Sequence, residues 1–167
     1  LYRFDAAVAH ARQAWTLLPG DLEPMRGAAM LLFLNARYDA SLAILREITP
    51  EDTTDVEALV LLADVAQRAG QPEAAGHYAA EALRRAPGHP RAVRILAHLE
   101  RRAGNPEAAR RRLQHRLPHD WQHPDRWRGM MELAAVLDAE GAVAAAFPMM
   151  SAAKQHLLHQ QPPCGNQ

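Results

Sequence analysis

The segment AQRAGQPEAA at residues 66–75 recurs as ERRAGNPEAA at residues 100–109, and this recurrence decides the fold. The two copies are displaced by 34 residues, and a period of this length is typical of stacked repeats that each consist of two helices. The same step backward from Gly70 reaches Ala36 and then Tyr2, each followed by a similar segment. The sequence therefore predicts one helical repeat array over most of the chain.

Glycine and proline mark the predicted helix ends. Gly70 and Gly104 stand where a helix ends in a left-handed residue, and Pro106 stands in the first turn of the next helix, where no backbone donor is lost. Asn105 is predicted to cap that helix. The next match after Gly104 is Gly141, 37 residues later, so the last repeat is irregular.

Apolar residues recur at helical spacing within each repeat, and we predict nine helices, beginning with a lone one from about Phe4 to Leu18. The repeat domain spans residues 1–158, as the second helix of a first repeat followed by four helix pairs, and residues 159–167 form a disordered tail. Pro148 is expected to kink or end the last helix. Small residues are predicted at the helix contacts, where a larger side chain would separate the backbones: Ala7, Ala29, Ser41, Ala63, Ala75, Ala97, Ala109, Ala134 and Ala146.

With these small residues in place, the chain resembles the tetratricopeptide-repeat family. The resemblance implies an all-α fold, a right-handed α-solenoid of antiparallel helix pairs, and a function as a protein-interaction scaffold whose first helices line a concave groove for peptides. Residues 132–141, followed by residues 144–147, also resemble the last repeat before the catalytic domain of bacterial tetratricopeptide-containing sulfotransferases. That second resemblance implies the alternative of a non-catalytic arm of a larger enzyme.

Placed on the repeat, the predicted groove carries a run of basic residues in the fourth repeat, and this run suits an acidic peptide or a carboxylate. The alternative is that these arginines only solvate a helix face and pair with Glu57, Asp64, Glu100 and Asp138. Val60 is placed on the same inner face. The candidate partner-binding residues are Arg26, Met30, Asp64, Arg91, Arg94, His98, Arg101 and Arg128.

Other chemistry has less support in the sequence. Arg110–Arg112 with His115 and Arg116 form a second basic cluster, but no aromatic residue is interleaved, and 19 basic residues balance 19 acidic ones, which argues against nucleic acid as the partner. His115, His119 and His123 lie four apart, but prolines interrupt that run, which favours loop residues over a metal site. We predict no cofactor and no catalytic site in this chain.

The remaining expectations concern location and self-association. The single cysteine, Cys164, favours a reducing compartment, no apolar run is long enough to span a membrane, and we predict a cytoplasmic protein. The chain begins within a repeat, so a preceding segment is expected. Self-association through a terminal helix, or capping by further helices, is predicted from two apolar stripes: Phe4, Val8, Ala11 and Trp15 in the first helix, and Val143, Phe147, Met150 and Leu157 in the last.

Overall fold

A computed structural model describes residues 4–18, 21–49, 55–116 and 126–160. Nine α-helices account for nearly all of these residues, and no strand occurs among them, so the predicted all-α fold is confirmed. The chain divides into two compact units, Leu1–Arg85 and Ala86–Gln167, which we call unit 1 and unit 2. Each unit is described by itself.

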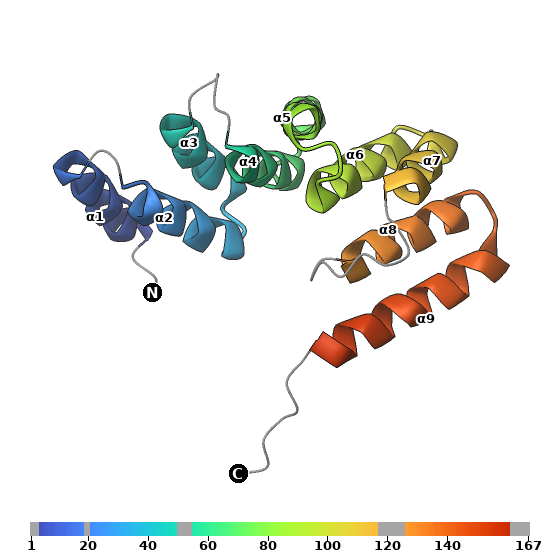
Figure 1. The fold of residues 1–167 in the computed structure, drawn as a ribbon. Coiled ribbons are helices and arrows are strands. Elements are labelled where there is room, and N and C mark those ends of the chain that lie inside the picture. The colour runs from blue at the N-terminus through green and yellow to red at the C-terminus, as the bar shows by residue number, and fades with distance from the viewer. Residues whose placement is uncertain (1–3, 19–20, 50–54, 117–125, 161–167) are drawn as a thin grey trace, which may run out of the picture. The chain divides into compact units, whose positions relative to one another are not determined.

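Unit 1 contains five helices that pack in chain order, each against the next (Figure 1). The pairs α2 with α3 and α4 with α5 are the predicted repeats, and α1 is the lone helix before them. The five helices are α1 (Phe4–Leu17), α2 (Glu23–Leu34), α3 (Tyr38–Ile48), α4 (Val56–Arg68) and α5 (Pro72–Arg85).

Unit 2 contains two helix pairs, α6 with α7 and α8 with α9. The first helix of the second pair, α8, contacts both α6 and α7, so it lies against both helices of the preceding pair. This is the packing expected when one repeat stacks on another. The four helices are α6 (Pro90–Arg102), α7 (Pro106–Arg116), α8 (Arg126–Ala139) and α9 (Val143–Gln160).

The first helix of every pair ends in the same way. Gly70, Gly104 and Gly141 have φ of 73°, 81° and 78°, and Ala36, at the equivalent position of α2, has φ of 58°. At each end two backbone bonds close the turn; after α4, for example, the N–H of Gln71 donates to the carbonyl of Ala66 at 2.9 Å. This is the left-handed helix termination that satisfies carbonyl groups left over by the last turn.

The small residues predicted at helix contacts are buried, with the exception of Ala7, which is half-buried. Ala63, Ala75, Ala97 and Ala109 are fully inaccessible to solvent, as predicted. Ser41, the one polar residue in this set, is also inaccessible to solvent, and its hydroxyl donates to the carbonyl of Ala29 at 2.7 Å. Helix α3 therefore lies close enough to α2 for a side chain of α3 to reach the backbone of α2.

The terminal helices agree with the predictions only in part. Pro148 does not end the last helix, because α9 continues from Val143 to Gln160; the proline lies near its start on the exposed side, where water can hydrate the carbonyl that loses its partner. The apolar stripe of α1 is partly covered, because Ala11 is buried and Phe4, Val8 and Trp15 are half-buried.

Candidate binding surface

The basic run predicted for the groove lies along α6 in unit 2. Arg91, Arg94, His98 and Arg101 are spaced three, four and three residues apart, which places them on one stripe of the helix, and all four are half-buried. The residues between them form the buried face of the same helix: Ala92, Val93, Ile95 and Ala97. The basic stripe therefore lies beside the buried face of α6 and is partly covered.

Two members of the stripe bind a carboxylate from α8. The Nε of Arg101 donates to Glu132 at 2.9 Å, and Nδ1 of His98 lies 3.2 Å from the other oxygen of the same carboxylate. The side chain of Glu132 is only 10% exposed. Burial alone would raise the pKa of Glu132, but the hydrogen bonds and charges of His98 and Arg101 outweigh burial and hold this pKa below its ordinary value.

Glu132 was missed by the sequence analysis, although the repeat contains a signal for it. When Gly141 is aligned with Gly104, Glu132 falls on the position of Ile95, which is Leu61 one repeat earlier. A carboxylate at a position that is otherwise apolar needs partners inside the protein. The partner of His98 and Arg101 is therefore Glu132, which was not among the acidic residues expected to pair with the stripe.

The basic stripe of α6 continues onto α8. Arg128 occupies the position equivalent to Arg91 and is exposed, with its guanidinium carbon 5.0 Å from the centre of the Trp127 ring. Asp138 occupies the position equivalent to Arg101 and is also exposed. The stripe positions of α6 and α8 thus carry Arg91, Arg94, Arg101 and Arg128, with one carboxylate, Asp138, among them.

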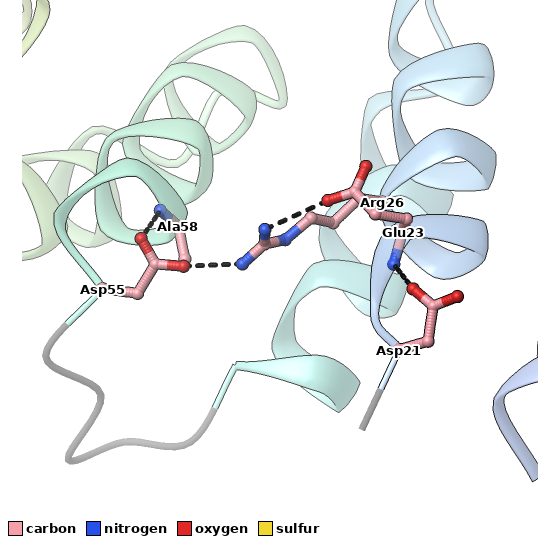
Figure 2. Close-up of polar contacts among 5 residues, drawn as sticks. All are labelled: Asp21, Glu23, Arg26, Asp55 and Ala58. Atoms are coloured by element: carbon pink, nitrogen blue, oxygen red, sulfur yellow. Dashed lines mark hydrogen bonds and ion pairs between the residues drawn. The ribbon is translucent and has the colours of Figure 1, made fainter. Parts of the chain in front are cut away.

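The candidate residues in unit 1 behave differently. Figure 2 shows Arg26 of α2 extended between two carboxylates: its guanidinium lies 2.6 Å from Asp55 and 3.4 Å from Glu23. The second oxygen of Asp55 accepts the N–H of Ala58 at 3.1 Å, so Asp55 caps α4 and holds Arg26 at the same time. Arg26 therefore links α2 to the start of α4, and two negative charges already offset its charge.

The other predicted groove positions of unit 1 are only partly accessible. Met30 is 40% exposed and Asp64 is half-buried, so both can meet a ligand. Val60 has no solvent exposure and belongs to the core, so the prediction that it lines the inner face was wrong. Val60 occupies the repeat position of Arg94, and an apolar side chain at this position is stabilised by burial.

Sequence comparison assigns the chain to a family. The tetratricopeptide-repeat profile matches residues 2–65 and 66–134, which together cover most of the chain. The chain belongs to the tetratricopeptide-repeat family. No curated protein matches this tetratricopeptide-repeat chain significantly, and nothing in the comparisons supports the resemblance to sulfotransferases.

Solved structures agree with the repeat fold of this tetratricopeptide protein. The crystal structure of MamA superposes with a TM-score of 0.71 at 15% identity, over 94% of this chain and 90% of MamA. YrrB, described as a TPR protein with an unusual peptide-binding site, gives 0.65 at 14% identity over 94% of this chain and 79% of YrrB. PilW, a type IV pilus biogenesis factor, gives 0.65 at 22% identity over 93% of this chain and 74% of PilW.

The second basic cluster of this tetratricopeptide-repeat protein, on α7, is internally paired. Arg112 bonds both oxygens of Glu100 at 2.6 and 3.0 Å, and Arg110 lies 2.9 Å from Glu140. Arg111 stands 3.9 Å from a carboxylate of the preceding turn. Because each of the three arginines already lies against a carboxylate, the cluster is poorly suited to collecting phosphates.

The predictions for the histidine run and for Cys164 fall largely outside the residues that the structure describes. His115 is exposed on α7, whereas His119 and His123 lie outside those residues, as does Cys164. Within the described part of the chain, no helix combines the length and the apolar character needed to cross a bilayer.

Proposed function

We propose that this protein is an interaction scaffold that binds an acidic peptide segment of a partner protein on the side of unit 2 formed by α6 and α8. The observation that carries the proposal is the stripe of arginines along α6, which Arg128 continues on α8. Guanidinium groups bind carboxylates in a planar, bidentate manner, so spaced arginines can read successive acidic side chains of an extended segment. Arg91, Arg94 and Arg128 are the proposed contacts.

His98 and Arg101 take a different role in this proposal. Because Glu132 already binds both, a ligand carboxylate would have to compete with a buried, hydrogen-bonded one. We therefore assign them to positioning α6 against α8, with their outward edges available to the ligand. In unit 1, Arg26 is assigned to holding α2 and α4 together. Met30 and Asp64 stay candidate contacts of unit 1 itself and are not part of the proposed site for the acidic segment.

Family membership supports the same class of function, because tetratricopeptide repeats stack into surfaces suited to holding other chains. YrrB is described as having a peptide-binding site, and it shares the fold of this chain. Neither fact specifies a ligand for this protein. The acidic character of the proposed ligand comes from the arginines of α6 and α8 alone.

The test is a pair of charge-reversal variants that change the net charge equally. Arg91→Glu with Arg128→Glu alters the proposed site, and Arg102→Glu with Arg111→Glu alters exposed arginines elsewhere on unit 2. Binding of a fluorescein-labelled peptide rich in aspartate and glutamate would be followed by fluorescence anisotropy at two salt concentrations. We expect a loss of at least about tenfold in affinity for the first variant and less than about twofold for the second.

Thermal unfolding followed by circular dichroism would verify that both variants remain folded. Equal weakening by the two variants would mean that the peptide responds only to overall charge. Unchanged binding by the Arg91 and Arg128 variant would show that the peptide binds elsewhere. Arg101 is deliberately left intact, because a glutamate at that position would face Glu132 and destabilise the unit.

A further inference from the structure

An apolar stripe runs along the exposed side of α9. Val143, Phe147, Met150 and Leu158 are 61%, 70%, 45% and 54% exposed. The exposed Lys154 completes the series, so successive members are four, three, four and four residues apart and lie on one face of the helix. Large apolar side chains gathered in this way mark a contact surface more often than isolated exposed residues do.

The repeat register shows that this stripe is not an ordinary feature of an outer helix. When Gly141 is aligned with Gly104, Met150 takes the place of Leu113 in α7. Two repeats before Leu113, the same position is occupied by Leu45 in α3. Leu113 has no solvent exposure and Leu45 has 2%. Each is buried within its own unit, whereas Met150 remains accessible. The side chain at this repeat position is therefore buried in α3 and α7, whereas in α9 it is exposed to solvent.

The residues of the stripe are also complementary to those of a second α9 helix packed antiparallel to it. In an antiparallel pair of α9 helices centred between Met150 and Ser151, Val143 of one copy faces Leu158 of the other, and Phe147 faces Lys154. The ends of the stripe then bury apolar groups together, and the one charged member meets an aromatic ring, which is a favourable contact for a cation. A parallel pair would instead bring the two copies of Lys154 together.

We propose that α9 is a dimerisation surface, and that its occupant is the α9 stripe of a second copy of this chain, packed antiparallel about a two-fold axis at residues 150 and 151. Such an interface uses the same patch on both copies, and the pairing closes without leaving a free site. From Val143 to Leu158 the stripe is about 22 Å long. A contact confined to one helix is small, so we expect a weak dimer with Kd on the order of 10 to 100 micromolar.

Cysteine cross-linking on the full chain tests the geometry. In a Cys164→Ala background, Met150→Cys places two thiols across the proposed axis, and we expect rapid formation of a covalent dimer under mild oxidation. Val143→Cys or Leu158→Cys alone should not cross-link, but a mixture of the two variants, one carrying a size tag, should give the mixed dimer. Cross-linking of Val143→Cys with itself would overturn the antiparallel arrangement.

Light scattering on the unmodified chain and on charge variants tests the surface independently. The unmodified chain should dimerise at several hundred micromolar, and Phe147→Lys should weaken the dimer at least about tenfold, because each new lysine would face Lys154. Phe147→Glu should weaken it less, because glutamate and Lys154 attract each other. Leu17→Lys is the matched control, since Leu17 of α1 is an equally exposed apolar residue at 74%.

The proposal is overturned if the unmodified chain is monomeric over this concentration range. It is also overturned if Leu17→Lys dissociates the dimer and Phe147→Lys does not, which would assign the contact to α1. Equal effects of lysine and glutamate at position 147 would exclude the pairing of Phe147 with Lys154. Circular dichroism would verify that each variant retains its helices.

Discussion

Replacing Ala36 with glycine should stabilise unit 1. Among the described residues, Ala36 is the one non-glycine residue with positive φ, and it closes α2 in the way that glycine closes α4, α6 and α8. A left-handed conformation costs an L-residue about 1 to 2 kcal/mol, and glycine avoids this cost. Glycine in turn loses about 0.5 to 1 kcal/mol more conformational entropy on folding than alanine. Because the side chain of Ala36 is exposed, little packing is lost.

The balance of these terms is a gain of about 0.5 to 1 kcal/mol in the free energy of unfolding for Ala36→Gly. With a urea dependence of about 2 kcal/mol per molar, the unfolding midpoint followed by circular dichroism should rise by about 0.3 to 0.5 M. Gly70→Ala should produce a loss of similar size, since a Cβ there would meet no other atom within 4 Å and the cost comes from the backbone alone.

Ala69→Gly provides the matched control, because Ala69 also stands at a helix end but has φ of −73°. Glycine there removes no strain and should lower the midpoint. The reasoning is refuted if Ala36→Gly leaves the midpoint unchanged or lowers it as Ala69→Gly does. Such a result would mean that Ala36 does not adopt the left-handed conformation in solution.

Two further predictions concern the interior. Ala75→Leu should lower the free energy of unfolding by about 1 to 3 kcal/mol through overpacking, and a loss below about 0.5 kcal/mol in urea denaturation would mean that the contact is loose. Glu132→Gln should be less stable than the unmodified chain at pH 7 by about 1 to 3 kcal/mol. Because the pKa of Glu132 is held below its ordinary value of 4.5, its contribution is complete above pH 4.5 and is lost as the pH falls below that value. The difference between the two proteins should therefore shrink on acidification, and a constant difference would contradict the assignment.

Much of the fold could be predicted because local signals agree with one another. The glycines that end α4 and α6, the capping residue Asn105 and the buried alanines all follow from the 34-residue register. Asn105 caps α7 as expected, accepting the N–H of Ala108 at 3.2 Å. These features depend on neighbours in the chain, which a sequence displays directly. The helix count and the helix contacts follow from them.

The candidate site could be predicted only in part, because its electrostatics depend on contacts between helices. The stripe on α6 was found from spacing, but the pairing of Arg101 with Glu132 joins residues 31 positions apart on different helices. Val60 shows the same difficulty, since periodicity places it on the inner face and packing buries it. Pro148 shows a third case, in which a helix-breaking residue is accommodated because the helix surface around it is exposed.

The buried carboxylate of Glu132 restricts how α8 can align along α6. Apolar side chains tolerate a range of alignments between two helices, because dispersion and burial change little when one helix slides along the other. A carboxylate that finds His98 and Arg101 in a single alignment does not share this tolerance, since any slip would strand a charge in the interior. We therefore expect Glu132 to act as a register pin, selecting one alignment of α8 on α6. Leucine at this position, as at residue 61, would keep the helices together while permitting more than one way of aligning them.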